Sequence, residues 1–482
     1  MPRRFNIDLA GLAADRTDAR SRAESESCAP SPPALLCTPT FSGKCVVGKT
    51  VFHGACEVFL NQTVVRARRE HTLSRSDIDP DALKVLYRLK QHGFKAYLVG
   101  GGVRDLLLGR RPKDFDVGTD AHPREIKRLF RNCFLIGRRF RLAHIRFGDK
   151  IIETSTFRRE PEPYEEHLKD GASYRRRDNT FGTPAEDARR RDFTINGLFY
   201  DIGTFNIIDH VGGLPDLEAG IVRCIGDPDV RFREDPVRML RAVRFASRLS
   251  FTIERGAYAA MRRHRGEIEH APAPRLLEEI RRLFAFRSGL PAFRMLFRSG
   301  LLAVLFPSIN AELRKRSSPC RKTFWRYLGA LDACAPDDED PPPLEIVFAT
   351  LLYPLFNARL DDARHGGGRR PHDEVAREVL QPVAERLALP RRAFYAAVHL
   401  LADQRSFGRT GRRFSRTRFV RRADFPDLLL MRTIHVTASD GEVDQLESWW
   451  RLYRENRRSE PREHGTRIGR RRGGAPRRRR RS

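Results

Sequence analysis

The sequence contains no apolar run long enough to cross a membrane. The longest such run, residues 346–356, is interrupted by Thr350 and Pro354, whereas a spanning helix needs about 20 apolar residues. We therefore expect a buried helix at this position and no transmembrane segment.

Features of secreted proteins are also lacking. The chain has only eight cysteines, with no C-x-x-C pair and no regular spacing, and no apolar segment of the kind found in secretory signals follows Arg3 and Arg4. Reduced, mostly buried thiols are expected, and the predicted location is cytoplasmic.

Acidic residues are too few to balance the basic ones. Lysine and arginine number 91 and aspartate and glutamate 62, which gives a net charge of +29. A charge of this size predicts attraction to a polyanion, most simply a nucleic acid, although a solvated basic surface is the alternative. The charge is clustered, because residues 457–482 contain 12 arginines, and such a segment predicts a disordered tail.

The residue pattern predicts an α+β region followed by helices. Asp79 and Pro80 begin a helix that ends at Gly93. Strands are expected at 96–99, 114–117, 142–147 and 150–157. The polar segment 158–182 is expected to be a mobile loop, and from Asp235 onward the apolar periodicity is helical.

The most informative pattern is LVGGGVRDLLLGRRPKDFDVGTDA, at residues 98–121. A strand leads into Gly100, Gly101 and Gly102 and then into a helix. Glycines at such a turn let the backbone approach a phosphate group closely. The turn alone is weak evidence, but a pair of aspartates follows it.

Asp114 and Asp116 are expected on one face of a strand, with Phe115 facing the core. Two carboxylates that face the same way repel each other unless a cation lies between them. Mg²⁺ held by carboxylates and substrate phosphates is the usual arrangement. A solvated strand face is the alternative, which the preceding glycine turn disfavours.

Three blocks of the sequence resemble motifs of the class II nucleotidyltransferases, a family of CCA-adding enzymes and bacterial poly(A) polymerases. Residues 98–121 resemble the head motif of this family. Residues 189–201, RRRDFTINGLFYD, resemble its ribose-recognition motif, and residues 231–249, RFREDPVRMLRAVRFASRL, resemble its base-recognition motif. The blocks occur in the same order as in the family.

The resemblance implies a role for each matching residue. Asp114 and Asp116 would hold two metal ions, Mg²⁺ or alternatively Mn²⁺, and Asp192 would be the third catalytic acid. The triphosphate would lie near Gly100, Gly101, Gly102 and Arg104, the ribose near Asp192 and Asn196, and the base near Asp235 and Arg238.

Composition and the resemblance together predict a division of the chain. The predicted parts are a poorly structured segment 1–75, a nucleotidyltransferase head 76–215 with a small mixed sheet, a helical neck 216–290 with the base-reading motif, a helical RNA-binding region 291–456 and a disordered arginine-rich tail 457–482.

The chemistry of Asp235 and Arg238 supports base recognition independently. An aspartate accepts from an exocyclic amine and an arginine donates to ring acceptors, which together match the edge of adenine or cytosine. Three residues apart on a helix, the two side chains would share a face. An ordinary surface ion pair is the alternative.

Further residues have two open interpretations. Glu153, on the strand expected at 150–157, could lie near the aspartate pair or be a solvated strand residue. Four arginines share a stripe of the helix that follows Asp235, and they could contact phosphates or form a solvated face. They are Arg238, Arg241, Arg244 and Arg248.

Two motif matches are predicted to have no function of their own. Residues 43–50 fit the phosphate-binding spacing G-x-x-x-x-G-K-T with Lys49, but Pro39 disfavours the strand that should precede it. His372 and Asp373 suggest a metal phosphohydrolase, but no second pair matches them, so a loop is expected there.

The predicted function is template-independent addition of adenylate from ATP to RNA 3′ ends, which would mark mRNA and other transcripts for decay. Residues 447–456 and the arginine-rich tail resemble the poly(A) polymerase branch, and RNA-decay proteins are candidate partners. A CCA-adding enzyme, which would also need CTP, is the near alternative. A non-catalytic RNA-binding protein is the distant one, and the intact acidic motifs disfavour it.

Overall fold

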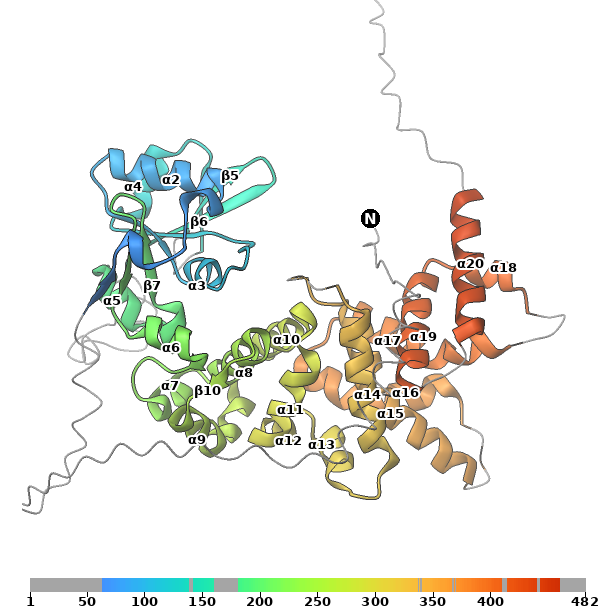
Figure 1. Cartoon of the computed structure of the whole chain (residues 1–482). Coiled ribbons are helices and arrows are strands. Elements are labelled where there is room, and N and C mark those ends of the chain that lie inside the picture. The colour runs from blue at the N-terminus through green and yellow to red at the C-terminus, as the bar shows by residue number, and fades with distance from the viewer. Residues whose placement is uncertain are drawn as a thin grey trace, which may run out of the picture.

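The computed structural model describes residues 63–137, 142–159, 181–336, 338, 340–365, 368, 370–409, 414–439 and 443–459. They form an α+β head at one end, from which successive helices extend in one direction (Figure 1). This is the predicted fold class. Across these ranges, no helix is both long and apolar enough to span a membrane.

Eight strands of the described chain form the mixed sheet of the head. In spatial order they are β1 (Val64–Arg66), β8 (Asn206–Asp209), β7 (Leu198–Asp201), β2 (Ala96–Val99), β3 (Asp116–Thr119), β6 (Lys150–Thr156), β5 (Leu142–Phe147) and β4 (Cys133–Ile136). Only the β3–β6 pair is parallel; each of the others is antiparallel. The predicted segment 1–75 overlaps this sheet, because β1 is its edge strand.

Helices α2 (Pro80–Gln91) and α4 (Pro123–Leu129) pack on one face of the sheet. The start of α2 follows from its sequence, because the Asp79 carboxylate accepts from the Asp81 amide and Pro80 occupies the first turn. Val85, Leu86 and other apolar residues of α2 are buried against the sheet. The opposite face carries a smaller apolar cluster that includes Val99 and Phe199.

Short elements complete the head and lead to the neck. They are α3 (Gly101–Leu107), α5 (Pro184–Arg189), α6 (Gly213–Ala219) and the two-stranded parallel sheet of β9 (Ile221–Val222) and β10 (Thr252–Ile253). The neck helices are α7 (Pro228–Glu234), α8 (Val237–Leu249), α9 (Arg255–Arg263), α10 (Ala273–Arg282) and α11 (Gly289–Ser299). Helix α8 packs against both α10 and α11.

The remaining helices continue the main core, which extends from the head to α20. They are α12 (Leu301–Leu305), α13 (Pro307–Arg314), α14 (Pro319–Cys334), α15 (Leu344–His365), α16 (His372–Leu387), α17 (Arg391–Asp403), α18 (Arg416–Val420), α19 (Phe425–Ser439) and α20 (Val443–Ser459). The apolar run at 346–356 is a buried part of α15, as predicted. The loop expected at His372 and Asp373 was wrong, because these residues form the first turn of α16.

Several predictions fall on residues outside the described ranges. These are the phosphate-loop match at 43–50, most of the expected loop 158–182 and most of the arginine-rich tail. Helix α20 continues to Ser459, so the first residues of the predicted tail are helical. The four cysteines in the described chain, Cys133, Cys224, Cys320 and Cys334, are buried free thiols.

Candidate active site

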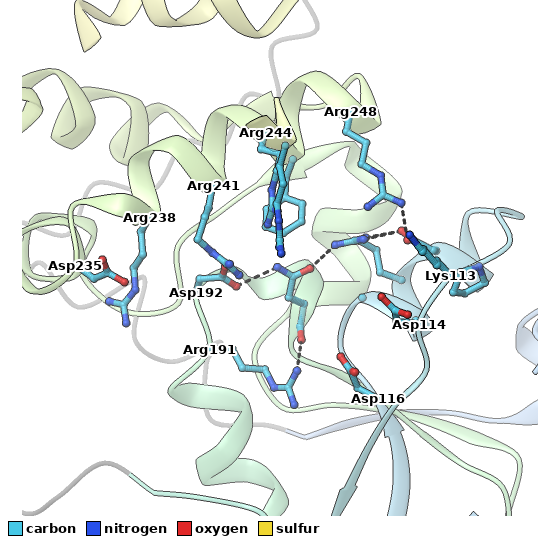
Figure 2. A pocket seen from close by; sticks show the side chains of 18 of the residues that line it. Lys113, Asp114, Asp116, Arg191, Asp192, Asp235, Arg238, Arg241, Arg244 and Arg248 are labelled. Carbon is cyan, nitrogen blue, oxygen red and sulfur yellow. Dashed lines mark hydrogen bonds and ion pairs between the residues drawn. The ribbon is translucent and has the colours of Figure 1, made fainter. Parts of the chain in front are cut away.

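A cavity of about 470 Å³ lies between the sheet of the head and helices α8 and α10 of the neck (Figure 2). Its lining includes Gly101, Gly102, Arg104, Asp114, Asp116, Asp192, Asn196, Asp235 and Arg238. The structure thus brings the three sequence blocks together around one space. Gly100, the remaining predicted site residue, precedes the first lining glycine and caps α3.

The glycine turn joins β2 directly to α3. Gly100 has φ of 71°, a region that side-chain-bearing residues rarely adopt, and a Cβ atom there would lie 2.6 Å from Arg191 Nη1. The backbone conformation therefore favours glycine at this position, while the Arg191 side chain could move to relieve the close contact. The turn places the backbone of Gly101 and Gly102 at the cavity wall, where a phosphate could approach it closely.

Asp114 and Asp116 point into the cavity at the same end (Figure 2). Strand β3 begins at Asp116, so Asp114 lies in the preceding loop and not on the strand, which corrects the expected strand boundary. Phe115 between them is buried in the main core. Neither carboxylate makes a hydrogen bond or ion pair with a residue that the structure describes.

Glu153 lies beside Asp116. The parallel pairing of β3 with β6 sets Val117 opposite Thr154, so Asp116 and Glu153 are neighbours one position earlier. Burial, together with the charge on Glu153, raises the pKa of the Asp116 carboxyl to about 6, although Arg191 opposes the shift. Glu153 also lies 3.6 Å from His144 Nε2 and is half exposed.

These carboxylates fit a divalent cation. No cluster of three or more histidine, cysteine, aspartate or glutamate side chains in the described chain has metal-binding geometry by itself. Two carboxylates are nevertheless sufficient for Mg²⁺, because substrate phosphates and water complete its coordination. The mutual repulsion around Asp116 would be relieved by a cation bound there.

Asp192 lies away from the aspartate pair, on the side of the cavity formed by α8. Its carboxylate accepts from Arg241 Nε at 2.7 Å and from Asn196 Nδ2 at 3.0 Å. Burial alone would raise the pKa of Asp192, but the Arg241 guanidinium and these hydrogen bonds hold the pKa below its ordinary value. Asp192 is therefore a fixed anion, well suited to accept hydrogen bonds from a bound ligand.

A chain of contacts links Asp192 to α3 and back to α8. Arg104 Nη1 donates to Asn196 Oδ1 at 2.6 Å, and Arg104 Nε donates to Asp105 Oδ1 at 2.8 Å. Arg248 Nη2 then donates to Asp105 Oδ2 at 2.9 Å. Arg104 is only 2% exposed, so its main role here is to hold Asn196, and its predicted place beside the triphosphate stays a prediction.

Asp235 and Arg238 line the far end of the cavity. Asp235 lies between α7 and α8 and not on one helix with Arg238, which corrects the expected helical spacing. Arg275 Nη2 donates to Asp235 at 2.8 Å, and Arg238 Nη1 lies 3.1 Å from Glu234. Both side chains are therefore positioned by a neighbour of opposite charge at the cavity wall.

The arginine stripe of α8 faces the cavity along its whole length (Figure 2). Glu279 on α10 lies 3.6 Å from Arg241 and 3.4 Å from Arg244. Burial lowers the pKa of Arg244 to about 10, although Glu279 opposes the shift. The stripe is thus a partly buried wall of the cavity, which excludes the interpretation as an ordinary solvated face.

The residues of this cavity or its wall that the sequence interpretation missed include Lys113, Arg191, Arg275 and Glu279. Lys113 and Arg191 directly precede Asp114 and Asp192, so their closeness to motif residues was an available signal. Arg275 and Glu279 lie on α10, outside every recognised block. Only the packing of α10 against α8 brings them to the site.

Three family models match the chain. "Poly A polymerase head domain" matches residues 96–223, "Probable RNA and SrmB- binding site of polymerase A" matches 250–313, and "Polymerase A arginine-rich C-terminus" matches 371–482. The chain is 39% identical over 405 residues to Poly(A) polymerase I of Escherichia coli O6:H1, covering 81% of this chain and 85% of the relative. The chain belongs to the poly(A) polymerase family. This confirms the resemblance seen in the three motif blocks.

Other relatives of this poly(A) polymerase family member differ in how much of the chain they match. Poly(A) polymerase I of Haemophilus influenzae is 37% identical, covering 82% of this chain and 88% of the relative. The CCA-adding enzyme of Staphylococcus haemolyticus is 35% identical over 51% of this chain and 60% of the relative. The crystal structure of the Bacillus stearothermophilus CCA-adding enzyme in complex with CTP matches with a TM-score of 0.59 and 26% identity, covering 78% of this chain and 83% of that chain.

Proposed function

We propose that this chain adds adenylate residues from ATP to RNA 3′ ends without a template and releases pyrophosphate. One observation carries the proposal: a single cavity contains a carboxylate pair at one end and the polar pair Asp235 and Arg238 at the other. The cavity belongs to a chain whose relatives at 37–39% identity over most of its length are poly(A) polymerases.

The arrangement suggests how ATP is oriented. Asp235 can accept from the exocyclic amine of adenine, and Arg238 can donate to a ring nitrogen. Asp192 and Asn196 lie between the two ends, where they would contact the ribose. Gly101 and Gly102 would then face the triphosphate beside Asp114 and Asp116. These residues together would contact one nucleotide from its base to its phosphates.

The reaction is an attack by the RNA 3′-hydroxyl on the α-phosphate of ATP, with pyrophosphate as the leaving group. Divalent ions held by Asp114 and Asp116, Mg²⁺ or Mn²⁺, would activate the hydroxyl and offset the charge of the leaving group. The side chains themselves mainly position the reactants and supply fixed charge, as is usual in phosphoryl transfer. Glu153 would strengthen cation binding from the neighbouring strand.

Addition of CCA is the second candidate, because the Bacillus stearothermophilus CCA-adding enzyme shares the fold. Adenine and cytosine both present an amine next to a ring acceptor, so Asp235 and Arg238 do not separate the two nucleotides by hydrogen bonding alone. The extent of sequence identity favours poly(A), since the Staphylococcus haemolyticus enzyme matches over only 51% of this chain.

The proposal can be tested by incubating the full chain with labelled ATP or CTP and two RNAs, one unstructured and one a tRNA lacking its CCA end. We expect long adenylate tails on the unstructured RNA and little use of CTP. The same assay is run on Asp116→Asn, which removes one of the paired carboxylates. Asp149→Asn, an exposed substitution in the same head, is its matched control. Addition that stops after CCA on the tRNA would instead establish the alternative.

We also propose a biological role for this activity. Tailing would mark transcripts for decay, in the cytoplasm and with RNA-decay proteins as partners. The family model for residues 250–313 describes an RNA- and SrmB-binding site, which supports a protein partner for this region. Copurification of such a partner with the chain, after nuclease treatment to remove RNA, would test this role.

A further inference from the structure

A second, smaller pocket of about 210 Å³ opens at the carboxylate end of the active-site cavity. It shares Lys113, Asp114, Arg244, Arg248 and Arg282 with that cavity. Because Asp114 lines both spaces, the side pocket begins at the position where the reaction would occur.

The side pocket lies on the side from which the RNA must arrive. Asp235 and Arg238 are at one end of the α8 row, and Lys113 and Arg248 are at the other (Figure 2). If the ATP base lies at the Asp235 end, the nucleoside of ATP fills the cavity up to Asp114. The attacking 3′-hydroxyl then has to reach the α-phosphate from beyond Asp114, where the side pocket lies.

The wall of the side pocket includes Phe286, which has a strained backbone. Its φ and ψ are 55° and 34°, and Arg287 beside it has φ of 53°. Two consecutive non-glycine residues in this region cost free energy and occur where the surroundings enforce them. Here the Phe286 amide donates to the Asp338 carbonyl at 2.8 Å, and Arg287 Nε donates to the Ala335 carbonyl at 2.8 Å.

The strained turn fixes the position of the Phe286 ring. The Arg248 guanidinium lies 4.0 Å from the ring centroid, and Arg248 also contacts Asp105 of α3. The ring is therefore tied to the head through one arginine and to the connection before α15 through its backbone. The guanidinium covers one face of this partly exposed ring, so a nucleobase would stack on the other face.

The charges of the side pocket suit a phosphate group. Five cations line it, namely Lys113, Arg244, Arg248, Arg281 and Arg282, against the acids Asp114, Glu278 and Asp340. Glu278 is shared by Arg281 and Arg282, and Asp340 is 3.3 Å from Lys113. The Nε atom of Arg248 is buried and has no hydrogen-bond partner in the part of the chain that the structure describes, whereas Arg244 Nε faces Glu279 Oε2 at 3.4 Å.

We propose that the side pocket holds the 3′-terminal nucleotide of the RNA, with its base stacked on Phe286 and its phosphate against the arginines. The proposal rests on the proposed function for the identity of the polymer. Stacking on a ring tolerates any base, which suits an enzyme that must extend RNA 3′ ends of different sequence. Phe286 would position the terminus, and the cations would hold its backbone.

The test compares Phe286→Gly with Phe286→Tyr. Glycine adopts φ of 55° without strain, so Phe286→Gly removes the ring and preserves the turn; Phe286→Tyr keeps the ring. Phe286→Leu removes the aromatic surface without changing the backbone strain and serves if the glycine variant does not fold. Tyr395→Ala, at an exposed aromatic on α17, is the control for losing a ring elsewhere.

Each variant is given a short RNA with a normal 3′-terminal nucleotide and the same RNA with an abasic one. We expect wild type and Phe286→Tyr to have a KM roughly 10-fold lower for the normal RNA, in the range of one stacked base. Phe286→Gly should have the same KM for the normal and the abasic RNA, and its KM for ATP should be unchanged. The same preference for the normal RNA in Phe286→Gly as in wild type would overturn the proposal.

A binding measurement separates this proposal from the proposed function. An RNA ending in 2-aminopurine, whose fluorescence falls on stacking, is titrated with the chain in the absence of ATP. Quenching by wild type and not by Phe286→Gly or Phe286→Leu supports the pocket even if no nucleotide is added, whereas equal signals from all of them reject it. Absence of ATP-dependent extension by wild type would reject only the proposed function.

Discussion

Arg241 and Asp192 form an ion pair that joins the neck to the head, with Arg241 Nη2 2.5 Å from Asp192 Oδ2. Asp192 lies in the head between α5 and β7, and Arg241 lies one turn after Arg238 on α8. The pair therefore connects the ribose-recognition block with the base-recognition block. Because Asp192 is largely buried, its charge depends on this partner.

Loss of Arg241 should destabilise the protein and weaken ATP binding. Arg241→Met leaves a buried carboxylate without its cation, and breaking such a pair costs about 3–5 kcal/mol. The double variant with Asp192→Asn should recover most of the free energy of unfolding without recovering activity. Urea unfolding and KM for ATP check this; equal activity of the double variant and wild type would show that the pair is structural only.

The aspartate pair should be essential for transfer and unnecessary for folding. Asp114→Asn and Asp116→Asn should each reduce nucleotide addition below about 1% of wild type, because a removed carboxylate no longer holds the metal that screens the phosphates. The melting temperature of each variant should equal or exceed that of wild type, since a repelling charge is removed. Near-normal addition by both variants would exclude this site.

Glu153 should affect the metal requirement more than the nucleotide requirement. Glu153→Gln removes the charge next to Asp116 and should raise the Mg²⁺ concentration for half-maximal activity roughly 10-fold, the size typical of residues adjoining metal ligands. The KM for ATP at saturating Mg²⁺ should change little. Glu269→Gln, at an exposed glutamate outside the cavity, is the control, and identical Mg²⁺ curves for both variants would make Glu153 a solvated strand residue.

Local sequence was sufficient to identify the glycine turn and the carboxylate pair. Glycine adopts the positive φ seen at Gly100 without a steric cost. Asp114 and Asp116 are separated by one residue, but Asp114 lies before β3, so strand alternation does not set their common direction. The spacing of Asp235 and Arg238 gave the right location and the wrong local structure, because α7 ends at Glu234 and a new helix begins at Val237.

Contacts between distant segments could not be predicted from the sequence. Glu279 contacts Arg241 only because α10 packs on α8, and no recognised motif covers α10. Phe286 is ordinary in sequence, and its strained backbone arises from hydrogen bonds to the segment before α15. The side pocket therefore depends on tertiary structure at every wall.

Asp332 should make stability depend on pH. This carboxyl on α14 accepts from the amides of Gly289 and Leu290, and burial raises its pKa to about 6 from 3.8 despite those bonds. The folded state therefore favours the protonated form, and stability is lost as pH rises from about 4 to 6, by up to about 3 kcal/mol.

Asp332→Asn removes this titration. As pH rises from 4 to 7, the free energy of unfolding of Asp332→Asn should increase relative to that of wild type. Urea unfolding at each pH measures this difference. The exposed substitution Asp361→Asn on α15 should follow the wild-type curve. A constant difference between Asp332→Asn and wild type across this range would contradict the shifted pKa.

Deletion of residues 457–482 should weaken RNA binding and leave the chemical step unchanged. The segment contains 12 arginines and falls within the match to the arginine-rich C-terminus family model. Arginines that contact phosphates release counterions, so their contribution decreases as salt rises. The truncated chain should therefore have lower RNA affinity at low salt, a shallower slope of log affinity against log salt, and shorter tails per encounter.

Turnover of the truncated chain at saturating RNA should match that of the full chain, because the carboxylates lie in the head. The matched control is a full-length chain with the same arginines replaced by lysine, which keeps the charge. Superimposed salt curves for the full and truncated chains would show that the tail contacts no phosphate and affects only solubility.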